Sequence, residues 1–157
     1  EAGMAQSHIF MEATTDRLPH VSDKALIDFV TFIIKMARQY QQLGGFQCMQ
    51  FFYPQQFGFT SGYPTGFDVQ GLLDTLGRVL EDSYNRSAAR TPYDPVEAEA
   101  AFLAVGEQLG ERVFYLNPEN LTNRDHYERS CATHLDYFGA LLKTPRPWNT
   151  LRYLYQE

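Results

Sequence analysis

Residues 22–43 read SDKALIDFVTFIIKMARQYQQL, and Gly44 and Gly45 follow directly. Apolar side chains recur in this segment at spacings of three and four residues, which places them on one face of an α-helix. They are Leu26, Phe29, Val30, Ile33, Met36, Ala37, Tyr40 and Leu43. Phe32 and Ile34 widen the apolar face, so we expect a central helix that other elements cover on more than one side.

Both ends of this helix carry local signals. Ser22 can accept a hydrogen bond from a free N–H of the first turn, and Asp23 places a negative charge there. Lys35 and Arg38 lie toward the negative end of the helix dipole. The glycine pair that follows can adopt the left-handed backbone that ends a helix. We therefore expect the helix to begin after Ser22 and to reach Leu43.

Three further segments, residues 68–84, 94–116 and 122–143, show the same helical periodicity. Each opens with a residue that commonly caps a helix, namely Asp68, Asp94 or Thr122. A short C-terminal helix follows Pro147, since proline favours the first helical position. The sequence predicts an all-α single domain, a bundle of four main helices plus a short C-terminal helix.

The remaining segments are less regular. We interpret residues 1–21 as an N-terminal arm that docks through Ile9, Phe10, Met11 and Leu18, and residues 22–157 as the helical domain. Residues 46–53 are too short for periodicity to distinguish a buried strand from a helical turn, so both remain open. Gly106 and Gly110 lie one turn apart, and we expect them to let a neighbouring backbone approach.

The composition is that of a soluble, acidic globular protein. The 157 residues include 19 Asp or Glu and 13 Lys or Arg, a formal net charge of −6. Nucleic-acid binding depends on clustered basic residues, and those here form no run, so we expect no nucleic-acid partner. The most apolar window, residues 25–37, is interrupted by Asp28 and Lys35 and is shorter than the ~20 apolar residues of a membrane span.

A loop rich in glycine, proline and aromatic residues follows the central helix. Residues 53–67 read YPQQFGFTSGYPTGF, in which three glycines and two prolines disfavour regular structure. Aromatic side chains on such a segment are typical of recognition surfaces, because they offer much contact area for little conformational entropy. The candidate binding residues are Phe57, Phe59, Tyr63, Phe67 and Tyr93. In the alternative interpretation, the loop aromatics pack onto the helices as a lid over the core.

The two cysteines, Cys48 and Cys131, are candidate disulfide partners. A bridge between them would stabilise the fold by about 4 kcal/mol in an oxidising compartment. The other interpretation is two buried free thiols. The chain opens with Glu-Ala-Gly-Met, which fits either a cloning scar or a mature end left by signal cleavage. Together these features favour an extracytoplasmic location, periplasmic or secreted, over a cytoplasmic one.

Reactive side chains are densest in the last main helix. Cys131 and His134 are three residues apart and project from one face, where an imidazole could activate a thiol. A nucleophile also needs an orienting group, and Asp136 projects from another side of the helix. The four histidines and two cysteines show no metal-ligand spacing, and no glycine-rich phosphate loop is present, so we expect no metal and no cofactor.

These observations lead to three hypotheses on function. The first is a protein-binding module without catalytic activity, such as an exported inhibitor or immunity-type protein that neutralises a partner protein. Its acidic charge would then steer a basic partner. The second is a small hydrolase or thiol-dependent enzyme that uses Cys131 and His134. The third is a carrier of an apolar ligand among Phe and Leu side chains. The oligomeric state is left open.

Overall fold

The computed structural model describes residues 11–60 and 62–156, and within them it contains helices and connecting segments but no β-strand. Residues 11–17 are helical and lead into the first 3-10 turn. The elements that follow are η1 (Leu18–His20), α2 (Asp23–Gln41), α3 (Gly45–Phe52), α4 (Pro54–Phe57), α5 (Val69–Tyr84), α6 (Pro95–Leu109), η2 (Gly110–Leu116), η3 (Pro118–Asn120), α7 (Arg124–Leu142) and α8 (Pro147–Tyr155). The prediction of an all-α single domain is confirmed.

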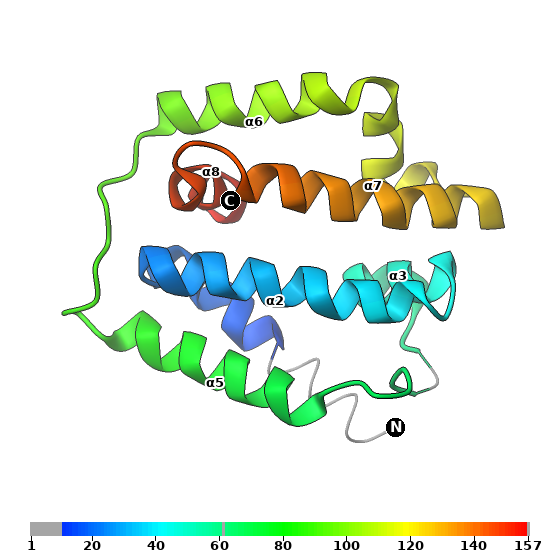
Figure 1. Cartoon of the computed structure of the whole chain (residues 1–157), viewed down its shortest axis with the longest axis horizontal. Coiled ribbons are helices and arrows are strands. Elements are labelled where there is room, and N and C mark those ends of the chain that lie inside the picture. Colours follow the sequence, from blue (N-terminus) through cyan, green and yellow to red (C-terminus); the bar gives the residue numbers. More distant parts are fainter. Residues whose placement is uncertain (1–10, 61, 157) are drawn as a thin grey trace.

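The long helices lie in the order α6, α7, α2 and α5 across the molecule (Figure 1). Helix α2 packs against α7 on one side and α5 on the other, and α3 and α8 also contact it. It is therefore the central helix, as its wide apolar face predicted. No helix in the described part of the chain is both long and apolar enough to cross a membrane.

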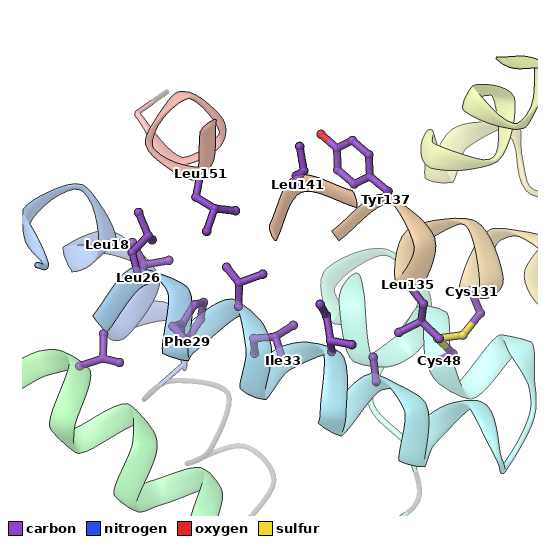
Figure 2. Close-up of a cluster of buried hydrophobic side chains, with 14 of the residues drawn as sticks. Leu18, Leu26, Phe29, Ile33, Cys48, Cys131, Leu135, Tyr137, Leu141 and Leu151 are labelled. Atoms are coloured by element: carbon purple, nitrogen blue, oxygen red, sulfur yellow. A yellow bond between two sulfur atoms is a disulfide. The ribbon is translucent and has the colours of Figure 1, made fainter. Parts of the chain in front are cut away.

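The hydrophobic core follows α2 along its length (Figure 2). Leu18 and Leu26 lie at one end, and Cys48 and Cys131 lie at the other. Leu18 and Val21 are fully buried, so the C-terminal end of the arm joins the core. Met11, farther toward the N-terminus, is half-buried. The predicted docking residues Ile9 and Phe10 lie outside the described residues.

Most predicted helix starts match the structure. The side chains of Ser22, Asp68 and Asp94 each accept a hydrogen bond from the backbone N–H three residues later. The last main helix differs by one residue, because Asn123 and not Thr122 is the cap. The segment left open at 46–53 is helical and forms α3, and four residues of the loop form the short helix α4.

The predicted C-terminal ends at Leu43 and Leu116 are too late. Helix α2 ends at Gln41, and Gly44 adopts a φ of 138°, so Leu43 turns outward and is 48 % exposed. Helix α6 ends at Leu109 because Gly110 takes a φ of 60°, and the chain continues as the 3-10 helix η2. The backbone conformations of Gly44 and Gly110 therefore set the C-terminal ends of α2 and α6.

The close backbone approach occurs at Gly45 and not at the two glycines expected. A Cβ atom added at Gly106 or Gly110 would meet no atom within 4 Å. A Cβ atom at Gly45 would lie 2.6 Å from the carbonyl carbon of Tyr127. Gly45 therefore allows α3 to pack directly on the backbone of α7.

Candidate functional site

The aromatic loop, together with α2 to α5, surrounds an open groove of about 530 Å³. We call it the aromatic groove, and its lining residues are Met11, Glu12, Tyr40, Gln50, Phe51, Phe52, Tyr53, Pro54, Gln55, Gln56, Phe59, Thr60, Tyr63, Phe67 and Leu72. Its volume lies within the range of about 300–1,000 Å³ found for ligand pockets. Aromatic side chains dominate the lining.

Local backbone features hold the loop over this groove. Tyr53 ends α3 and begins α4, and Pro54 occupies the first position of α4, where its missing N–H costs nothing. Gly58 ends α4 with a φ of 81°. The side-chain amide of Gln50 then donates hydrogen bonds to the carbonyl oxygens of Phe57 and Phe59, at 3.1 and 3.3 Å. These two hydrogen bonds fix the path of the backbone from α3 into the aromatic loop.

A series of ring contacts forms one wall of the groove. Tyr63 stacks on Phe67 with ring centroids 5.0 Å apart, and Phe67 meets the edge of Tyr40 at 5.4 Å. Tyr40, which is 3 % exposed, stacks in turn on Phe51 at 5.0 Å. Its hydroxyl forms a hydrogen bond with Thr60. The loop is therefore packed onto α2 and α3 through aromatic contacts.

The side chains at the rim of the groove are more exposed than those of this wall. Phe59 is 51 % exposed, although it lies in the groove lining. Glu12 accepts a hydrogen bond of 2.8 Å from the side-chain amide of Gln55. Burial raises the pKa of Tyr40, and it raises the pKa of Tyr53 to about 12, so both phenols are neutral at physiological pH. Among the described residues that line the groove, Glu12 is the one with an ionised side chain.

The structure brings together three of the five predicted binding residues. Phe59, Tyr63 and Phe67 line the aromatic groove. Phe57 is half-buried beside it, where its ring contacts Phe46 at 6.0 Å and Tyr127 at 5.6 Å. Tyr93 precedes the cap of α6 and lies outside the groove lining. Tyr63 and Phe67 pack toward α2 as the lid interpretation expects, whereas Phe59 is 51 % exposed.

Sequence reasoning missed the contribution of the other elements. The sequence pattern places Tyr40 on the core face of the central helix, and the groove-lining residues of α3 belong to a segment whose structure the pattern leaves open. The run of three aromatics at Phe51, Phe52 and Tyr53 was the available signal. Three consecutive aromatics on a helix point to different sides, so they cannot all face one core.

His134 forms a buried hydrogen-bond network next to the groove. Its Nδ1 atom lies 2.8 Å from the carbonyl oxygen of Ser130, which can only accept, so Nδ1 carries the proton. The Nε2 atom therefore accepts, and the Tyr53 hydroxyl donates to it at 2.7 Å. The ring also stacks on Phe52 at 5.1 Å. Burial lowers the pKa of His134, although the bond to Ser130 acts in the opposite direction.

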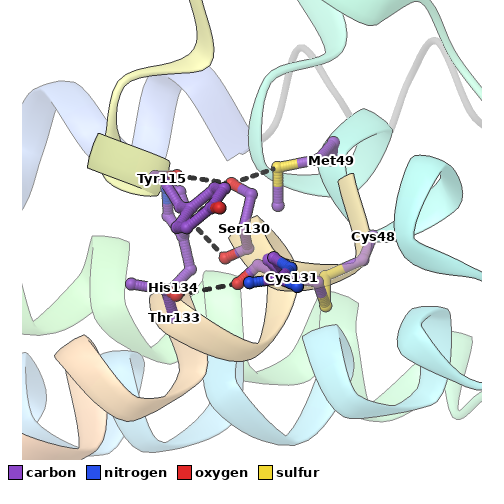
Figure 3. Close-up of a disulfide and its surroundings, with 8 residues drawn as sticks. Cys48, Met49, Tyr115, Ser130, Cys131, Thr133 and His134 are labelled. Carbon is purple, nitrogen blue, oxygen red and sulfur yellow. Dashed lines mark hydrogen bonds between the residues drawn. A yellow bond between two sulfur atoms is a disulfide. The ribbon is translucent and has the colours of Figure 1, made fainter. Parts of the chain in front are cut away.

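Cys131 offers no nucleophile to this histidine. The Sγ atoms of Cys48 and Cys131 lie 2.05 Å apart, at disulfide distance, and both residues are fully buried (Figure 3). Ser130 is also fully buried, and its hydroxyl donates to the carbonyl oxygen of Tyr115 at 2.6 Å. Asp136 is exposed and binds Arg112 at 2.6 Å. The arrangement holds α7 against α3, and Ser130, Cys131 and His134 are all buried within it.

Nowhere in 11–60 and 62–156 do three or more His, Cys, Asp or Glu side chains gather so that they could hold a metal ion. Comparisons of the chain with protein-family models, with curated proteins and with solved structures find no match.

Proposed function

We propose that this protein is a binding module without catalytic activity, and that it holds apolar side chains of a protein partner in the aromatic groove. The observation that carries the proposal is the half-exposed ring of Phe59 at the rim of a groove whose wall is built from packed aromatics. Large aromatic side chains that lose solvent on binding supply much of the energy of protein interfaces.

Two exposed apolar side chains outside the groove lining support a protein partner. Phe46 is 39 % exposed and contacts Phe57, two residues before Phe59 in the chain. Leu43, at the adjoining turn, is 48 % exposed. A carrier of a small molecule would gain nothing from these outward-facing side chains, whereas a protein partner would cover them.

The paired cysteines support a narrower form of the proposal. A disulfide persists in an oxidising compartment and is rare in the cytosol. An exported inhibitor or immunity-type protein that neutralises its partner fits such a compartment. In that role the partner's function would be blocked by contact alone, without any reaction.

A second candidate function is the transport of an apolar small molecule. The groove volume of about 530 Å³ favours it, because this is the size of pocket that takes small ligands. Native mass spectrometry of protein purified from its source separates the two functions. A co-purified small molecule would favour the carrier, and its absence would favour the protein partner.

A selection from displayed peptides tests the main proposal. Random dodecapeptides are selected in parallel against the wild-type protein and against the double variant Phe59→Ala/Tyr63→Ala. We expect the wild type to enrich a convergent family of peptides with apolar and aromatic residues, and the double variant to enrich none of them.

The matched control is Phe114→Ala, since Phe114 is an aromatic residue of η2 with 48 % exposure and lies outside the groove lining. This variant should enrich the wild-type peptide family. Thermal unfolding of each variant confirms that it is folded. Enrichment of the same family by the double variant, or of no family by the wild type, would contradict the proposal.

A further inference from the structure

We infer that the outer face of α6 is a second docking surface, and that it binds a basic amphipathic helix of a partner protein. This face lies on a different element from the aromatic groove and does not depend on the function proposed for that groove. Exposed apolar residues of α6 form its centre, and acidic residues lie beside them.

Helix α6 forms the outermost layer on one side of the molecule (Figure 1). In the part of the chain that the structure describes, it packs against α7, α8 and η2, and Ala98, Val105 and Leu109 are buried. Val96 and Leu103 project from the other side and are 77 % and 60 % exposed. They are seven residues apart, which places them on one line along the helix, two turns from each other.

Small residues next to this line leave room for the backbone of another helix. Ala100 and Ala104 are exposed on the same side. Gly106 follows Leu103 by three residues, and a Cβ atom added there would meet no atom within 4 Å. Glycine destabilises a helix interior relative to alanine, and no contact among the described residues requires it at this position. A partner helix packed closely against this side accounts for it, since helices approach nearest where the contact residues are small.

The charges on α6 are all negative. The helix contains three glutamates and no Lys or Arg. Glu97 is paired with Arg146 of α8 at 2.8 Å. Glu99 and Glu107 are exposed, and neither forms an ion pair with any residue of 11–60 or 62–156. An apolar stripe with Lys or Arg at its flanks complements such a face, because opposite charges then meet across the interface.

Helix α5, at the opposite edge of the molecule, shows what a solvated outer face looks like in this chain (Figure 1). Its exposed side chains include Asp74, Arg78 and Glu81, so both signs of charge are present. Leu73 is exposed there as well, but only to 38 %. A polar outer face is usual for a helix at a protein surface. The apolar face of α6, with charges of one sign, therefore differs from its counterpart.

A second copy of this chain fits the face poorly. Glu99 and Glu107 lie four residues before and after Leu103. An antiparallel pair of α6 helices centred on Leu103 would place Glu99 of one copy beside Glu107 of the other, and a parallel pair would place each Glu99 beside its equivalent. Like charges across an interface are unfavourable. A basic helix avoids this repulsion, and the net charge of −6 attracts it over a longer range at low salt.

Two synthetic peptides of about 18 residues test the inference on the full chain. Both contain the same numbers of Leu, Ala and Lys. In the first, the leucines recur at spacings of three and four residues, and in the second the order is changed so that this period is lost. NMR amide shifts of the protein locate each peptide and give its dissociation constant. We expect the patterned peptide to shift the amides of α6 and to bind about fivefold more tightly than the reordered one.

Matched variants on the two outer helices separate a local site from general attraction. Leu103→Ala should weaken binding of the patterned peptide about fivefold, and Leu73→Ala on α5 should change it by less than about twofold. Glu107→Gln should weaken binding about threefold. Glu81→Gln on α5 changes the net charge equally and should weaken binding by less than about 1.5-fold.

Three results would overturn the inference. The first is equal affinity for the two peptides, or equal losses in Leu103→Ala and Leu73→Ala. The second is a set of amide shifts confined to the loop of the aromatic groove, which would leave the proposed function intact but remove the role of α6. The third is a dimer of the free chain, detected by analytical ultracentrifugation, that Leu103→Ala dissociates, because a second copy would then occupy the face.

Discussion

At the scale of single residues, the contacts of His134 determine how the protein responds to acid. The imidazole is 3 % exposed, donates from Nδ1 to Ser130 and accepts at Nε2 from Tyr53. Adding a proton at Nε2 would remove the acceptor that Tyr53 needs and would place a charge in an apolar site. Burial therefore lowers the pKa of His134.

The free energy of unfolding should therefore fall as the pH drops below about 6.5. The unfolded chain binds a proton at His134 near that pH, whereas the folded chain binds it only at a lower pH, so protons favour unfolding. The decline attributable to this residue is at most about 1.4 kcal/mol per pH unit. Urea unfolding at a series of pH values measures it, and His134→Gln should flatten the curve below about pH 6.5.

NMR of the imidazole gives an independent check of the same prediction. The His134 ring should keep the signals of the neutral form, with the proton on Nδ1, at pH 6.5 and somewhat below. A ring that is half protonated at pH 6.5 or above would contradict the expected direction of the pKa shift.

At the scale of secondary-structure elements, the contact of α3 with α7 places one end of the groove. Gly45 begins α3 and has no side chain to separate the two backbones. Its Cβ position is occupied by backbone atoms of Tyr127 and Glu128, and helix backbones cannot move aside as a flexible side chain can. The register of α3, and with it the position of the aromatic residues at its end, depends on this approach.

Gly45→Ala should destabilise the fold by about 1–3 kcal/mol through overpacking. The control is Gly139→Ala in α7, where an added Cβ atom would meet nothing within 4 Å. That control should stabilise the protein by about 0.5–1 kcal/mol, because alanine favours a helix interior more than glycine does. Denaturant unfolding of both variants measures the difference, and equal effects would show that α3 and α7 are not in backbone contact.

The same scale shows what could be predicted from the sequence. Helix starts at Ser22, Asp68 and Asp94 depend on residues within one turn, so local signals were enough. The helix at Gly45 to Phe52 was not predictable, because eight residues carry too little periodicity and the close contact with α7 is tertiary. The glycine, proline and aromatic residues of the loop mark it as unusual, but the groove also needs Tyr40 of α2, which no local pattern connects to the loop.

At the scale of the whole molecule, the disulfide between Cys48 and Cys131 joins α3, which lines part of the aromatic groove, to α7. Their Cα atoms are 5.9 Å apart across 83 positions of sequence. The bridge connects α3, which supplies part of the groove, to the middle of α7. A cross-link over so long a segment restricts the unfolded chain strongly.

The double variant Cys48→Ala/Cys131→Ala should lose about 4 kcal/mol of stability, and wild-type protein unfolded in a reducing agent should show a comparable loss. Urea unfolding with and without the reducing agent provides the measurement. Because both sulfur atoms are fully buried, reduction should require prior unfolding. Unchanged unfolding midpoints, or two thiols that react rapidly in the native protein, would show that the bridge is absent.

The function proposed for the whole molecule requires that an exposed aromatic residue of the groove serves binding and not folding. For Phe59→Ala, the thermal unfolding midpoint is compared with the affinity for a dodecapeptide that the displayed-peptide selection enriches on the wild-type protein. We predict a midpoint within about 2 °C of the wild type and an affinity lower by about tenfold. A midpoint lower by about 6 °C or more together with unchanged affinity would show that Phe59 is part of the lid and that the groove is not a binding site.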